Sequence, residues 1–70
     1  MKNRIQELRR DKRMTQEELA GLCSVTRQTI ISLESGRYNP SIFLAHKIAQ
    51  IFELSIEEVF IFEEDTHELR

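Results

Sequence analysis

The chain has 70 residues but only one cysteine, one proline, two glycines and no tryptophan, and these scarcities exclude several classes of protein. The single cysteine, Cys23, cannot form an internal disulfide, and it lacks the paired cysteine or histidine spacing of a zinc site. Because no second thiol or activating base is adjacent, we expect Cys23 to be a small core side chain rather than a redox centre. No apolar run approaches the roughly 20 residues that span a bilayer, and no signal peptide opens the chain, so we expect a reduced, cytoplasmic protein.

The sequence also lacks motifs that are typical of enzymes. The chain has no glycine-rich phosphate loop and no plausible catalytic triad. The adjacent acids at 57–58 and 63–65 are expected on a solvated face or tail, and His46 is a lone histidine on a mostly polar face. Since there is no internal repeat, low-complexity segment or linker, residues 1–70 are expected to form one domain. We therefore expect a single domain that is not an enzyme and holds no metal or cofactor.

Positive and negative charges are divided unevenly along the chain. The formal net charge is −2, yet residues 1–40 hold eight lysines and arginines against five acids, a balance of +3. Residues 41–70 hold two basic residues against seven acids, a balance of −5. This division predicts that the first part of the chain faces a polyanion and that the second faces solvent or a protein partner.

The stretch from Thr15 to Gly36 predicts two short helices joined by a tight turn. Thr15 and Glu18 form a T-x-x-E capping box, so one helix is expected over about 16–23. Thr26 caps the next helix, expected over about 27–35, and Gly36 ends it in the left-handed conformation. The side chains of this pair that we expect to face inward are Leu19, Ala20, Cys23, Ile30 and Leu33.

Three further helices are predicted around this pair. The first begins directly after its cap, Asn3, and the fourth is expected over about 42–52 behind Ser41. The fifth begins after Ser55, which forms a second capping box with Glu58. The core residues expected in these helices are Ile5, Leu8, Ile42, Ala45, Ile48, Ala49, Phe52, Ile56, Val59 and Phe60.

The remaining apolar residues near the C-terminus leave two alternatives open. Phe43 falls outside the apolar stripe, so it is either a partly exposed aromatic or an interface residue. The β-prone run at 60–62 either pairs as a strand with residues 1–3 or lies in a dimer contact, for which Phe60 and Phe62 are the candidates. Residues 63–70 are acidic and without pattern, so we expect a frayed tail.

The polar face of the third helix is the candidate binding surface. Its start presents Arg27, Gln28, Thr29 and Ser32, and arginine and glutamine carry the paired groups that match guanine and adenine edges. A helix N-terminus also attracts phosphate through its backbone N–H groups. We therefore predict that these four side chains contact DNA bases, and that Arg9 or Arg10 at the end of the first helix contacts phosphate.

The set of motifs resembles the Cro/phage-repressor-like (XRE) family of helix-turn-helix regulators, over about residues 4–62. The segments that carry the resemblance are T15-Q-E-E-L-A20, V25-T-R-Q-T-I30, L33-E34, G36-R-Y-N-P-S41, L44-A45, K47-I-A49 and I56-E-E-V-F60. The resemblance implies an all-α, five-helix, lambda-repressor-like domain with the helix-turn-helix at about 16–35. It also implies a short terminal β-strand pair and a two-fold dimer on a palindromic operator.

By position, the resemblance also assigns residues. It implies that Gln16 holds a phosphate, that Thr26 and Arg27 contact backbone or base, and that Gln28 and Ser32 lie toward bases. The loop after the third helix would contact phosphate through Arg37, Tyr38 and Asn39. Glu34 would be structural, in an ion pair with an arginine of the first helix.

Three positions depart from the family pattern. Ser24 stands where a glycine commonly gives the turn a positive φ, which serine adopts at some cost. Ile31 and Ser32 replace a pair that is often polar or basic, and Phe43 replaces a usual polar residue. The turn at Ser24 is where we expect strain.

Two functions compete at this point. The first is a sequence-specific, double-stranded DNA-binding transcriptional regulator, a repressor that acts as a homodimer because one copy of this size buries too little surface alone. The second is an antitoxin or adaptor whose acidic C-terminal half binds a protein partner, with DNA binding secondary. The basic first part of the chain favours the regulator.

Overall fold

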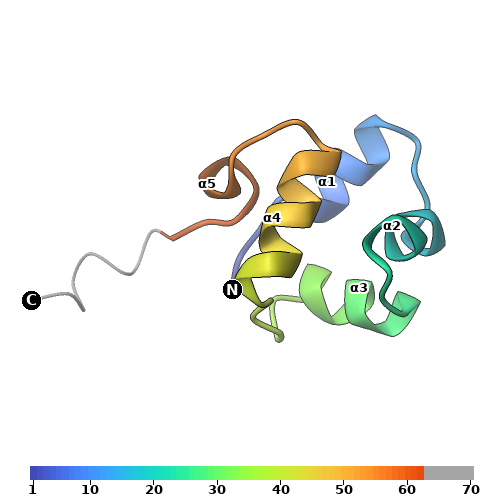
Figure 1. The fold of residues 1–70 in the computed structure, drawn as a ribbon, viewed down its shortest axis with the longest axis horizontal. Helices are drawn as coiled ribbons and strands as arrows, with labels where there is room; N and C mark the ends of the chain where they lie inside the picture. The colour runs from blue at the N-terminus through green and yellow to red at the C-terminus, as the bar shows by residue number, and fades with distance from the viewer. Residues whose placement is uncertain (63–70) are drawn as a thin grey trace, which may run out of the picture.

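Five helices enclose an apolar core in the computed structural model, which describes residues 1–62 (Figure 1). Figure 1 shows α4 in the middle of the molecule, with α5 on one side and α2 on the other. The all-α, five-helix prediction is confirmed, while the predicted tail at 63–70 lies outside the described residues. The helices are α1 (Ile5–Asp11), α2 (Gln16–Cys23), α3 (Arg27–Glu34), α4 (Ile42–Ile51) and α5 (Ile56–Val59).

The starts of α2 to α5 are set by side-chain caps, as predicted. In the first capping box, Glu18 N donates to Thr15 Oγ1 at 3.0 Å and Thr15 N donates to Glu18 Oε1 at 2.7 Å. The second capping box, between Ser55 and Glu58, is also present. At α1 the N-cap residue is Arg4 rather than the predicted Asn3, although Asn3 Oδ1 still accepts a hydrogen bond from Ile5 N at 3.1 Å. These bonds satisfy N–H groups that have no partner inside the helix.

Each of the first four helices is followed by one residue in the left-handed conformation. At the α2–α3 turn, Ser24 has φ of 59°, and Val25 N donates to Ala20 O at 3.0 Å, which closes the last turn of α2. The positive φ predicted for Ser24 is confirmed. The other residues with positive φ are Arg13 (55°), Glu53 (59°) and Gly36 (83°). Sequence reasoning missed Arg13 and Glu53, because neither is a glycine or asparagine.

The core contains most of the side chains that helical spacing predicted. Ile42 is the exception, since it is 67% exposed, and its prediction as a core residue was wrong. It is the first residue of α4, and helical spacing gives the direction of a buried stripe but not how far the core extends along it. The buried apolar side chains are Ile5, Leu19, Ala20, Cys23, Ile30, Leu33, Ala45, Ile48, Ala49, Phe52, Val59 and Phe60.

The two ends of the described chain meet at one isolated antiparallel bridge, between Asn3 and Phe60. It is flanked by two backbone bonds, Arg4 N to Val59 O at 2.8 Å and Ile61 N to Lys2 O at 2.9 Å. The predicted β-strand pair is therefore reduced to a single bridge. Phe60 is 1% exposed, so its prediction as a dimer-interface residue was wrong. Its ring completes the core beside α5 and has no surface left for a second chain.

Asn3 also connects the N-terminal segment to α3. Its amide Nδ2 donates to Leu33 O at 2.8 Å and to Met1 O at 3.1 Å. Leu33 lies in the last turn of α3, and its carbonyl also accepts from Gly36 N at 3.0 Å. Asn3 therefore adds a second hydrogen bond to the end of the helix. Within residues 1–62, no helix is long and apolar enough to cross a membrane.

Candidate nucleic-acid interface

The start of α3 presents polar side chains because its other face is buried. Thr26 Oγ1 accepts from Thr29 N at 3.3 Å, which caps the helix. Ile30 and Leu33 face the core, so Arg27 and Gln28 lie on the exposed side. The cap and the buried stripe together aim the first turn of α3 outward.

A shallow hollow of about 220 Å³ lies along this exposed side of α3. It brings together three of the four predicted base contacts with Tyr38 from the loop after α3. Its residues carry four hydroxyl groups and one amide, which can accept hydrogen bonds from base edges or donate to them. The lining residues are Thr26, Gln28, Thr29, Ser32 and Tyr38.

A larger hollow of about 660 Å³ lies where the end of α1 meets the start of α2. Four arginines line it together with Gln16, the first residue of α2. Guanidinium groups beside a helix N-terminus attract a phosphate, since both supply N–H donors and positive charge. The four arginines are Arg9, Arg10, Arg13 and Arg27.

Arg13 and Gln6 also line this larger hollow, although neither was predicted as a phosphate contact. Arg13 belongs to a basic run whose charge the helix dipole alone could explain. The left-handed conformation of Arg13 turns the chain between α1 and α2, and no glycine marks that turn in the sequence.

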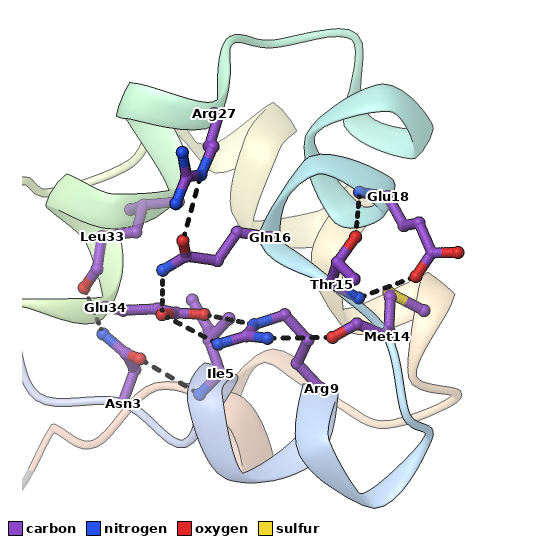
Figure 2. Close-up of polar contacts among 10 residues, drawn as sticks. All are labelled: Asn3, Ile5, Arg9, Met14, Thr15, Gln16, Glu18, Arg27, Leu33 and Glu34. Carbon is purple, nitrogen blue, oxygen red and sulfur yellow. Dashed lines mark hydrogen bonds and ion pairs between the residues drawn. The ribbon is translucent and has the colours of Figure 1, made fainter.

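Arg9 differs from its neighbours, because its guanidinium is used inside the protein. Nε donates to Glu34 Oε2 at 2.8 Å, Nη2 to Glu34 Oε1 at 3.4 Å, and Nη1 to Met14 O at 2.9 Å (Figure 2). The side chains of Arg9 and Glu34 are only 11% and 7% exposed. The ion pair expected between Glu34 and the first helix is thus present. Arg9 joins α1 to α3, so of the two arginines predicted to contact phosphate, the exposed Arg10 remains the candidate.

Gln16 lies between this ion pair and Arg27 (Figure 2). Its Nε2 donates to Glu34 Oε1 at 3.0 Å, and its Oε1 accepts from Arg27 Nε at 3.2 Å. One amide hydrogen and one oxygen lone pair of Gln16 therefore have partners within the protein. Gln16 keeps a second amide hydrogen that can donate, so its contact with a phosphate stays a prediction.

The loop after α3 carries the other predicted phosphate contacts. Arg37, Tyr38 and Asn39 are all exposed. Tyr38 reaches the hollow beside α3, whereas Arg37 and Asn39 line neither of the two hollows. The loop begins where Gly36 adopts φ of 83° and Arg37 N donates to Ser32 O at 3.3 Å.

Comparison with known proteins identifies this arrangement. A sequence profile of the helix-turn-helix family matches residues 5–59. The chain belongs to the XRE-type helix-turn-helix regulators. An HTH-type transcriptional regulator of Archaeoglobus fulgidus is 54% identical over 65 residues, which cover 93% of this chain and 92% of the relative. One of Methanocaldococcus jannaschii is 49% identical over 65 residues, covering 93% of this chain and 98% of the relative.

Solved structures of other regulators share the fold of this XRE-type chain. The restriction-modification controller protein C.AhdI of Aeromonas hydrophila superposes with a TM-score of 0.72 at 33% identity, covering 79% of this chain and 83% of C.AhdI. A chain of the SinR–SinI complex superposes with a TM-score of 0.71 at 26% identity, covering 96% of this chain and 63% of that one. The predicted lambda-repressor-like fold is confirmed.

Away from α3, this XRE-type regulator exposes apolar side chains near the start of α4 and the bridge. Phe43 is 83% exposed, which confirms that it is not a core residue. Beside it in the sequence, Ile42 lines a hollow of about 240 Å³ together with Ile56 and Phe62. We call the four exposed apolar residues Ile42, Phe43, Ile61 and Phe62 the apolar patch, of which Ile42 and Phe62 line this hollow. Their exposed fractions are 67%, 83%, 37% and 40%.

The buried Cys23 lines none of the three hollows described above. Burial raises the pKa of the Cys23 thiol, and the positive charge of Lys47 opposes this rise with a smaller effect. A raised pKa keeps the thiol protonated at neutral pH, and only the thiolate is a good nucleophile or metal ligand. Cys23 therefore acts as a core side chain of α2, as predicted.

Proposed function

We propose that this regulator reads a specific double-stranded DNA site by placing the start of α3 in the major groove. The observation that carries the proposal is the exposed first turn of α3, capped by Thr26 and flanked by an arginine-lined hollow. Arg27 and Gln28 supply the bidentate groups that distinguish guanine and adenine. Thr29 and Ser32 extend the contact along the shallow hollow beside them.

Phosphate contacts on both sides of α3 would orient it on the duplex. We propose Arg10, Gln16 and Thr26 on the side of α2, and Arg37, Tyr38 and Asn39 on the other side. Such contacts carry no sequence information, but they set the register of the helix in the groove. Because each one releases a counterion when the contact is ionic, they also make binding salt-dependent.

We propose that two copies bind together to a palindromic operator. A single domain of this size buries too little surface for tight specific binding, and a two-fold dimer reads two half-sites about 34 Å apart. A dimer that covers a promoter acts as a repressor. Since its target is the chromosome, we place the regulator in the cytoplasm.

The apolar patch is the surface we propose for the second copy. If a fully exposed aromatic or branched side chain presents about 150–200 Å², the four exposed fractions amount to about 400 Å² of apolar surface. That is about half of the roughly 800 Å² that each partner buries in a stable interface. A polar rim would supply the rest. Phe62 stays in the proposed interface, whereas Ile42 and Phe43 take the place of Phe60.

A mobility-shift titration against genomic fragments tests the proposed function. We expect a subset of fragments to bind at moderate salt far more tightly than random DNA of the same length. Binding no tighter to any fragment than to random DNA would reject the regulator. Sedimentation of Phe43→Ser, with His46→Ser in the same helix as a control, tests the dimer, since only the first change should raise the monomer fraction. A patch that instead retains a different protein during purification would favour the antitoxin or adaptor function.

A further inference from the structure

Arg27 is connected to the buried ion pair of Arg9 and Glu34 through one side chain, Gln16 (Figure 2). Glu34 is the last residue of α3, Arg27 is the first, and Gln16 begins α2. The contacts therefore run from the end of α3, across the start of α2, and back to the start of α3. Two hydrogen bonds carry this connection, at 3.0 Å and 3.2 Å.

The carboxylate of Glu34 determines which way the Gln16 amide points. A carboxylate only accepts hydrogen bonds, so the amide nitrogen of Gln16 must face it. The amide oxygen is then turned to the opposite side, where it meets Arg27 Nε, which only donates. Because Arg9 donates to both oxygens of Glu34, the carboxylate cannot rotate away from Gln16 without breaking the ion pair.

Arg27 is held through Nε, which leaves its terminal Nη1 and Nη2 groups for a ligand. These two groups form the planar fork that matches the O6 and N7 atoms of guanine. Arg27 is exposed and lines the larger hollow, so its fork lies beside the proposed DNA surface. A side chain that is already oriented loses less conformational entropy when it binds.

We propose that Gln16 and Glu34 are positioning residues that orient Arg27 to read one base pair of the operator. This inference rests on the proposed DNA-reading function of α3. Gln16 then affects sequence preference at the base pair that Arg27 reads, in addition to any phosphate it holds. Glu34 acts at the same base pair from inside the protein, without touching DNA.

Binding of the full chain to its operator, and to every single-base-pair variant of that operator, tests the proposal. Arg27→Ala identifies the base pair at which preference falls, by about 5- to 150-fold. We expect Gln16→Ala to reduce preference at that same base pair by about two- to tenfold, the worth of one hydrogen bond. In the Arg27→Ala background, Gln16→Ala should cause no further loss of preference there. Gln50→Ala, an exposed glutamine of α4, is the matched control.

A uniform loss of binding across all sequences in Gln16→Ala would overturn the proposal, because it would leave only a phosphate contact. Preference that changes additively in the double variant would overturn it as well. Glu34→Asp, which keeps the charge on a shorter side chain, should reproduce the Gln16→Ala pattern at the same base pair. Unchanged preference in a folded Glu34→Asp protein would remove Glu34 from the positioning pair.

Hydrogen exchange at Arg27 Nε in the free protein separates this proposal from the proposed function. We expect exchange to be about two- to tenfold faster in Gln16→Ala than in the wild-type protein, and equal to the wild-type rate in Gln50→Ala. Equal exchange rates in all three proteins would overturn the positioning role whatever the protein binds. If exchange responds as expected but the unchanged chain prefers no DNA sequence, the positioning holds and the proposed function fails.

Discussion

Removing the guanidinium of Arg9 while leaving Glu34 in place is the sharpest test of how α3 is held. Arg9→Met keeps a long apolar side chain, but the Glu34 carboxylate, 7% exposed, loses the two Arg9 donors at 2.8 Å and 3.4 Å and keeps only the neutral amide of Gln16 at 3.0 Å. Leaving one member of a buried ion pair without its partner costs about 3–5 kcal/mol. A chain of this length has a free energy of unfolding of about 4–10 kcal/mol, so the variant would retain little stability.

Urea unfolding followed by circular dichroism measures this loss. With a slope of about 1 kcal/mol/M, the midpoint should fall by about 3 M or more at the same protein concentration. Arg10→Met is the matched control, since Arg10 is exposed and its change should stay within about 0.5 kcal/mol. Arg9→Met combined with Glu34→Met should regain most of the stability, because no unpaired charge remains. A midpoint for Arg9→Met close to that of Arg10→Met, or a double variant no more stable than Arg9→Met alone, would refute the reasoning.

Four further changes test other parts of the structure. Gln28→Ala should weaken specific binding by about 1–3 kcal/mol and relax one base position, measured by titration against operator variants; an unchanged preference would contradict base contact. Arg37→Ala should weaken binding to all sequences alike and lower the salt slope by about 1, so a constant slope would count against a phosphate contact. Ser24→Gly should raise the free energy of unfolding by about 0.5–1 kcal/mol, because φ is 59° there; a lower melting temperature would disprove this strain. Phe60→Ala should cost about 3–5 kcal/mol through lost core packing, and dimer dissociation without lost stability would argue for an interface instead.

Local signals in the sequence predicted most of the helices. The start of α2 follows from the capping box at Thr15 and Glu18, whose partners lie three residues apart in the sequence. The left-handed conformation of Ser24 was predicted from the family resemblance, because a glycine commonly occupies that position of the turn. Arg13 and Glu53 adopt the same conformation without a glycine, so only the meeting of neighbouring helices in three dimensions reveals them.

The residues that were placed wrongly depend on contacts between distant parts of the chain. Arg9 and Arg10 are adjacent and chemically identical, and only the position of Glu34 on α3 decides which of them lies inside. Phe60 is buried because residues 2–4 pair with the chain on either side of it. Ile42 is exposed because it is the first residue of α4, and the buried residues of that helix begin only at Ala45. Helical periodicity contains none of this information.

In the candidate site, too, local features were predicted and a contact network between distant residues was not. The types of its side chains were predicted, since arginine and glutamine at a capped helix start suit base edges. The connection from Glu34 through Gln16 to Arg27 was not, because it joins three residues that are separated in sequence by 18 and 11 positions. Such a network requires the packed arrangement of α1, α2 and α3.

Methylation interference on a selected operator tests the central claim, that α3 enters the major groove, most directly. Dimethyl sulfate methylates guanine N7, which lies in the major groove, and adenine N3, which lies in the minor groove. We predict that N7 methylation blocks binding at guanines in two half-sites about one helical turn apart. Interference from adenine N3 alone, or from neither position, would contradict major-groove reading by α3.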